Sequence, residues 1–171
     1  MTSALFEKLL NGETMISAER ELLAAGAAAV PILASIFDGT ARNAFGVAYR
    51  DLGLPLRCAL EVAAQLGPQA KPLEGFLVQE LLNGMWPAAS ALGALRSLED
   101  SSIVALASCL DSRDNDLAME SAVALIHCGE THHIEVERAA SQSMQAAKSI
   151  ALMQRHLQRV RPISWEPGLP G

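Results

Sequence analysis

The densest group of metal-capable side chains lies between residues 127 and 133. It contains one cysteine, one glutamate and three histidines: His127, Cys128, Glu130, His132 and His133. Thiolate, imidazole and carboxylate groups are the ligands that zinc prefers, but no second ligand pair with zinc spacing occurs elsewhere in the chain. Gly129 is typical of a helix end, where a preceding histidine is favoured by the helix dipole. The pattern favours turn chemistry over a zinc site, so we expect no metal and no cofactor.

Nucleophilic catalysis has little support in the sequence. The chain has no Gly-x-Ser-x-Gly motif and no glycine-rich phosphate loop. Cys128 directly follows His127 on an expected helix, and adjacent helical residues do not face each other. We therefore expect no catalytic residue and no enzymatic activity.

Acidic residues are concentrated in one part of the chain. Between positions 99 and 120 the only basic residue is Arg113, whereas six residues are acidic: Glu99, Asp100, Asp111, Asp114, Asp116 and Glu120. One interpretation is that such acids cap helix N-termini. The functional interpretation is an acidic ridge that attracts a basic partner and speeds association, and we predict that these six residues bind a partner. By contrast, the segment from Lys148 to Arg161 has basic residues and no acid.

Composition narrows the classes of function. Hydrophobic residues make up 50% of the 171 residues and aromatic residues only 4%, which suits close packing of helices. The net charge of −6 argues against a protein that binds the phosphate backbone of nucleic acids. The three cysteines form no Cys-x-x-Cys motif, which indicates a reducing, cytoplasmic environment. We expect no signal peptide and no membrane-spanning segment.

A repeat predicts the elements that position these residues. Ala59, Ala91 and Ala122 occupy corresponding positions, separated by 32 and 31 residues. Upstream, the segment 26–32 aligns with 67–73, with glycine, alanine and proline in matching places. Self-similarity at a fixed period is typical of stacked units that bury their apolar faces against their neighbours.

The apolar spacing and the turn residues predict an all-α fold. Glycine, proline and capping residues place the ends of the expected helices. The final helix is the longest, and its polar outer face suits a cap at the end of a stack. We expect one domain over 1–161 and a Pro/Gly-rich tail over 162–171. The expected helices cover 3–12, Ser17 to Gly26, 27–38, 55–66, 69–83, 86–98, 101–111, 115–128 and 134–160.

Residues 39–54 interrupt the period as an insertion of roughly ten residues. This segment contains Phe45, Arg50 and Tyr49, which is the only tyrosine of the chain. Insertions in repeat proteins often form the binding face, so we predict that these three residues contact a partner. The alternative is an extra, irregular helical turn that only pads the repeat.

The repeat resembles that of HEAT-like proteins, in particular the short bacterial form that includes phycobilin-lyase-type repeats. The segments Val30-Pro31-Ile32-Leu33 and Lys71-Pro72-Leu73 carry the resemblance. The usual Asp-x-x-x-x-Val-Arg junction is nearly absent, and residues 111–116 are its closest remnant. The resemblance implies an α-solenoid of about four antiparallel helical hairpins in a right-handed superhelix, which serves most often as a scaffold for other proteins.

The function that we expect is therefore a non-catalytic protein–protein interaction module. An adaptor and an immunity-type inhibitor are its two forms, and each would bind a partner protein, for example a basic one, through an acidic or a concave surface of the solenoid. An alternative is a lyase-like chaperone that acts on a modified protein. A HEAT-like DNA glycosylase fits less well, because this acidic chain with few aromatic residues lacks a basic surface for DNA. We expect neither a nucleic acid nor a membrane as partner.

Overall fold

The computed structural model describes residues 2–159 as helices joined by turns. Within this range no strand forms, and the only bridge between extended residues joins Arg42 to Ala48. The prediction of an all-α fold is confirmed for this part of the chain. The expected tail over 162–171 lies outside the described residues.

Ten α-helices and three short 3-10 helices make up the described part. The α-helices are α1 (Thr2–Lys8), α2 (Gly12–Ala25), α3 (Val30–Phe37), α4 (Leu54–Leu66), α5 (Glu74–Leu82), α6 (Trp86–Ala94), α7 (Asp100–Cys109), α8 (Asn115–Cys128), α9 (Ile134–Gln142) and α10 (Met144–Arg159). The 3-10 helices are η1 (Gly26–Ala29), η2 (Tyr49–Leu52) and η3 (Gly67–Leu73).

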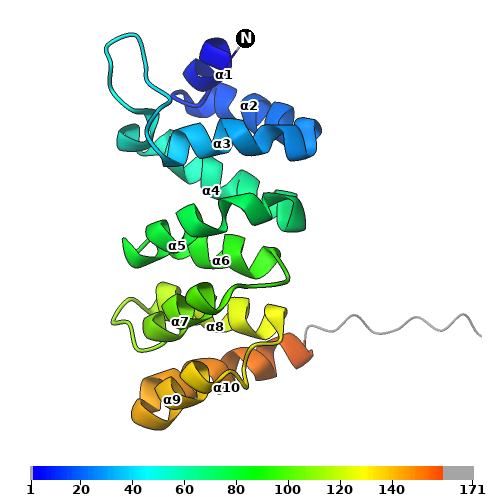
Figure 1. Ribbon diagram of the computed structural model, residues 1–171, viewed down its shortest axis with the longest axis vertical. Coiled ribbons are helices and arrows are strands. Elements are labelled where there is room, and N and C mark those ends of the chain that lie inside the picture. Colours follow the sequence, from blue (N-terminus) through cyan, green and yellow to red (C-terminus); the bar gives the residue numbers. More distant parts are fainter. Residues whose placement is uncertain (1, 160–171) are drawn as a thin grey trace, which may run out of the picture.

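The helices are stacked along the long axis of the molecule, with α1 near one end and α9 and α10 at the other (Figure 1). Helices α2, α4, α6, α8 and α10 pack against one another in succession, and α5, α7 and α9 do the same. The two rows are joined because α5 packs on α6, α7 on α8 and α9 on α10. The loop 38–53 and the α7–α8 turn emerge on one side of this stack, and the α6–α7 connection lies on the other (Figure 1).

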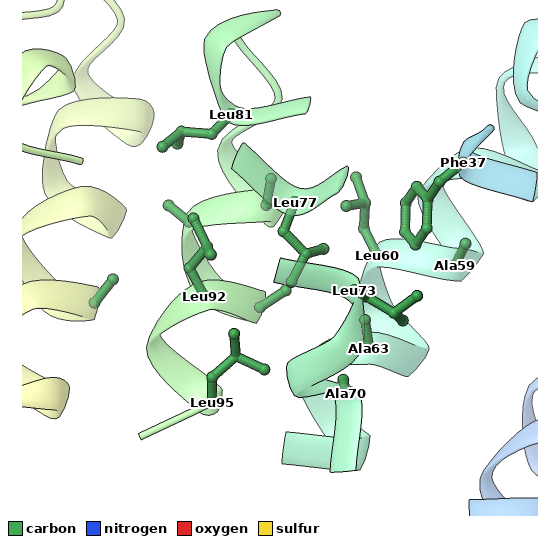
Figure 2. Packing of buried hydrophobic residues seen from close by; sticks show 14 of the residues in the cluster. Phe37, Ala59, Leu60, Ala63, Ala70, Leu73, Leu77, Leu81, Leu92 and Leu95 are labelled. Atoms are coloured by element: carbon green, nitrogen blue, oxygen red, sulfur yellow. The ribbon is translucent and has the colours of Figure 1, made fainter. Parts of the chain in front are cut away.

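Small side chains allow a close approach between α6 and α8. A Cβ atom added to Gly93 on α6 would lie only 2.8 Å from the Cα atom of Ala124 on α8. The repeat-related Ala59, Ala91 and Ala122 are all fully buried, as the alignment predicts. Leucines fill the space beside these alanines, and Figure 2 shows Leu60, Leu73, Leu77, Leu92 and Leu95 between neighbouring helices.

The prediction of one long helix over 134–160 is wrong. The chain leaves the helical conformation at Ser143, with φ −129° and ψ 122°, and α10 then packs on both α8 and α9. The Ser143 hydroxyl accepts a hydrogen bond from the N–H of Ala146, which is how a serine caps a helix N-terminus. The apolar residues before and after Ser143 keep the spacing of one continuous helix. Their spacing in the sequence therefore did not reveal the break.

Other boundaries also differ from those expected. Helix α2 begins at Gly12 instead of Ser17, because Asn11 caps it by accepting the N–H of Glu13. The helices expected over 27–38 and 69–83 begin as η1 and η3. Prolines lie in or directly after these two segments, and they remove the N–H groups that a regular α-helix needs.

One described stretch passes a length-and-composition test for a membrane span. This stretch, Gly12–Phe37, is long and apolar enough to cross a bilayer, contrary to what we expect from the sequence. In the structure the chain turns at Gly26, where φ is 56°, and the two parts on either side, α2 and α3, both pack on α4. Core helices of folded proteins pass the same test.

We predict that Gly93→Ala lowers the free energy of unfolding by about 1–3 kcal/mol, because the added methyl group would press against the backbone of α8. A glycine-to-alanine change within a helix normally stabilises it by up to about 1 kcal/mol. Gly75→Ala on α5 is the matched control, because a Cβ there meets no atom within 4 Å. Thermal unfolding of both variants tests the contact, and equal stabilisation by the two changes would contradict it.

Candidate interaction surface

Six exposed large apolar side chains fall in two segments of the chain, 45–54 and 82–86, and the Arg50–Glu80 ion pair links the first segment to α5, the helix that ends at Leu82. We call them the apolar edge: Phe45, Val47, Leu52, Leu54, Leu82 and Trp86. The other exposed large apolar residues in the described chain lie on four helices, with Ile16 on α2, Val104 on α7, Ile134 on α9, and Met144 and Leu152 on α10. Singly exposed apolar residues are normal on a protein surface, whereas a segment that exposes several of them is a candidate interaction site.

The tip of the loop 38–53 is held in shape by its own polar groups. The side chain of Asn43 accepts hydrogen bonds from the N–H groups of Phe45 (2.9 Å) and Val47 (3.0 Å). The Arg42 guanidinium donates to the carbonyl of Gly46 at 2.8 Å, and φ at Gly46 is 77°. These contacts present the ring of Phe45 to solvent, where 90% of its surface is exposed.

An ion pair ties the loop to the last turn of α5. The Arg50 guanidinium donates to Glu80 Oε1 at 2.8 Å and also to the carbonyl of Phe37. Glu80 is only 3% exposed, and its second oxygen accepts from Asn83 at 3.4 Å. Arg50, which the sequence suggests as a partner contact, therefore uses its charge inside the molecule, and its partly exposed stem is what remains for a partner.

The proposed role of Tyr49 as a surface contact is wrong. Its side chain is completely buried and its ring packs on Phe6, with 5.0 Å between ring centroids. The phenol donates to Glu7 at 2.7 Å. Burial, with the neighbouring Glu7 carboxylate, raises the pKa of Tyr49 to about 12. Tyr49 thus anchors the base of the loop, and of the three insertion residues only Phe45 is fully available to a partner.

The acidic residues fall in three separate places. Asp111, Asp114 and Asp116 lie at the α7–α8 turn, on the same side as the loop 38–53 (Figure 1). Glu99 and Asp100 lie at the start of α7, roughly 15 Å away along a helix of ten residues. Glu120 lies within α8, where it accepts a hydrogen bond from Ser90 at 2.7 Å.

Local hydrogen bonding explains part of the acidic cluster. Asp114 caps α8 by accepting the N–H groups of Asp116 and Leu117. Asp111 accepts the hydroxyl of Ser143 and so links the α7–α8 turn to the start of α10. Asp116 is exposed, and its carboxylate forms no hydrogen bond or ion pair with the described residues. It is therefore the acid of this turn that is most available to a partner.

The structure contains a buried carboxylate, Glu74, that no pattern in the sequence singles out. Glu74 is 5% exposed and accepts from the Ser102 hydroxyl at 2.7 Å and from the N–H of Glu99 at 2.8 Å. Its other oxygen lies 2.5 Å from Lys71 Nζ. Burial acts to raise the pKa of Glu74, but Lys71 and these hydrogen bonds outweigh burial and hold the pKa below its ordinary value.

The histidine-rich segment forms turns and caps. His133 caps α9 by accepting the N–H of Glu135, and His132 lies 3.4 Å from a carboxylate oxygen of Glu137. Burial lowers the pKa of His127, and Arg96 adds to the effect. Cys128 lies near the carbonyls of α6, and burial raises the pKa of its thiol. Within residues 2–159, no three His, Cys, Asp or Glu side chains come together as ligands for a metal.

We predict that Arg50→Ala lowers the free energy of unfolding by about 2–4 kcal/mol, because it leaves the buried Glu80 without its charged partner. Arg57→Ala is the matched control, because the exposed pair of Arg57 with Glu61 contributes less than about 1 kcal/mol. Urea unfolding measures both effects. Similar losses of unfolding free energy in the two variants would show that the Arg50–Glu80 ion pair does not hold the loop in place.

We predict that Glu74→Gln lowers the free energy of unfolding by about 1–3 kcal/mol at neutral pH, because charge-assisted hydrogen bonds are lost. Since the pKa of Glu74 is lower in the folded state, its ionised form stabilises the protein above about pH 4–5, and this advantage is lost as the pH falls through the folded-state pKa. Unfolding curves of the wild type and the variant should converge in acid. If the unfolding free energies of the wild type and the variant differ by the same amount at every pH, the ionised Glu74 carboxylate does not stabilise the fold.

Comparison with known proteins adds nothing to this geometry. No protein-family model, curated protein or solved structure matches the chain. Any inference about function must therefore come from the surface itself, where an ordered apolar loop and an acidic turn lie on the same side of the stack.

Proposed function

We propose that this protein is a HEAT-like α-solenoid that binds another protein and catalyses no reaction. The repeated sequence and the successive packing of α2, α4, α6, α8 and α10 support the proposed architecture. In this architecture, paired antiparallel helices form a superhelix, and the insertion 39–54 projects from one side as a recognition element.

The observation that carries the proposed function is the apolar edge around Phe45. Phe45 is exposed at the loop tip and adds no contact to the core. A partner protein with a suitable pocket can bury its ring. Because the loop is already held by Arg42, Asn43 and Arg50, little conformational entropy is lost when a partner binds.

The partner that we propose is a protein with a pocket for Phe45 and a separate group of basic residues, because α5 and α6 lie between the loop 38–53 and the α7–α8 turn (Figure 1). Asp116 at the α7–α8 turn lies on the same side of the stack and supplies the complementary charge. This arrangement fits an adaptor or an immunity-type inhibitor. The three unpaired cysteines fit a reducing, cytoplasmic setting.

Site-specific photo-crosslinking tests this function. A benzophenone amino acid is placed at position 45, or at the exposed Gln69 on the far side as the matched control. We expect position 45 to capture one protein in the native cell, and excess unlabelled wild type to compete for it. Identical products from both positions would contradict the proposal.

The captured partner then allows a quantitative test. We predict that Phe45→Ser weakens binding by at least about tenfold, as expected for a buried aromatic anchor, whereas Gln69→Ser leaves the affinity unchanged. Asp116→Lys should mainly slow association, and its effect should shrink as salt is added. Unchanged affinity of the Phe45 variant, measured by calorimetry, would remove the loop from the interface.

A further inference from the structure

Helices α6 and α8 run parallel and in a fixed register. The Ser90 hydroxyl on α6 donates a hydrogen bond to Glu120 Oε2 on α8 at 2.7 Å. About one turn further along both helices, Gly93 meets the backbone of Ala124. Both contacts advance in the same direction along the two helices. Residues one turn before Ser90 and Glu120 therefore also lie beside each other.

Trp86 and Asp116 occupy that earlier turn. Trp86 is the first residue of α6 and lies four residues before Ser90, and Asp116 lies four residues before Glu120 in the first turn of α8. The side chain of Trp86 is 39% exposed, and Asp116 is exposed. An indole ring and a carboxylate therefore lie side by side where the two helices begin, on the side of the stack where the α7–α8 turn emerges (Figure 1).

Asp116 is the acid of this surface with an open position for a ligand. Three other acids lie on α8 or in the turn before it: Asp111, Asp114 and Glu120. Each of these three accepts a hydrogen bond from the protein. The Asp116 carboxylate, by contrast, has no partner among the described residues.

The nearby basic residues do not cancel the negative charge. Arg113 is the only basic residue of the α7–α8 turn. Arg57 on α4 is already paired with Glu61 at 3.2 Å. Lys148 lines a groove together with Asn115, on the side of α8 that faces α10 instead of α6. The surface beside Trp86 therefore attracts a cation.

We propose that Trp86 and Asp116 bind an arginine side chain of the partner protein. The guanidinium plane stacks on the indole ring and donates hydrogen bonds to the Asp116 carboxylate. Arginine suits both groups because it is planar, always charged and weakly hydrated, whereas the lysine ammonium is a strongly hydrated point charge. The inference rests on the proposed function, because this arginine is one of the partner's basic residues, separate from the pocket for Phe45.

A titration of the full chain with acetyl-arginine amide, followed by nuclear magnetic resonance, tests the site without the partner. We expect the indole N–H signal of Trp86 and the backbone N–H signal of Asp116 to shift together, with one dissociation constant. Trp165→Phe identifies the Trp86 signal, because the chain has two tryptophans. Acetyl-citrulline amide is the matched neutral ligand and should shift neither signal, and acetyl-lysine amide should bind more weakly than the arginine compound.

Two substitutions separate the charge from the aromatic face. Asp116→Asn and Trp86→Leu should each weaken the binding of acetyl-arginine amide by about two- to fivefold. Asp100→Asn is the matched control, an exposed acid at the start of α7 on the other side of the stack, and it should leave the affinity unchanged. Because Asp116 is exposed, its variant should fold even if Trp86→Leu does not.

An unchanged Trp86 signal, or equal shifts with the arginine and citrulline compounds, would overturn the proposal. So would equal affinity for the lysine compound, or wild-type affinity of the Asp116→Asn variant. These titrations are independent of the crosslinking at position 45. A chain that captures a partner but fails the titrations has the proposed function without the arginine site. A chain that binds acetyl-arginine amide but captures no partner has the site and contradicts the proposed function.

Discussion

The contact between Gly93 and the backbone of Ala124 sets the spacing of the stack. Helix α6 packs between α4 and α8 and is covered by α5, so its separation from α8 also affects how it lies on α4 and α5. That separation determines where the turns at each end of the helices emerge. The loop around Phe45 and the acidic turn before α8 keep their relative positions only while these helices stay in close contact.

Two buried carboxylates add directional hydrogen bonds to the apolar packing of the helices. Glu80 is paired with Arg50 and holds the loop 38–53 against α5, and Glu74 is bonded to Ser102 and the backbone of Glu99 and holds the α6–α7 connection. Each joins segments well separated in sequence, at opposite ends of α5. Apolar contacts are non-directional, so these directional bonds are what orient the turns.

The sequence predicted the features that depend on local chemistry and period. Repeated alanines predicted the buried Ala59, Ala91 and Ala122, and Gly129 marked the end of α8. The break at Ser143 escaped prediction because the apolar stripe stays in phase across it. The burial of Tyr49 escaped because its partner Glu7 lies 42 residues away in sequence. Such long-range pairings, including that of Arg50 with Glu80, leave no local pattern in a single sequence.

The loop tip is held by hydrogen bonds within the loop, separately from the contacts that join its base to the core. Phe45 projects from a turn whose hydrogen bonds come from Arg42 and Asn43 within the loop, while the core contacts belong to Tyr49 and Arg50 at its base. Substitutions at position 45 therefore change the exposed chemistry without opening a cavity in the core. A change of residue at the loop tip can therefore alter the chemistry of this surface while the helical stack beneath it stays constant.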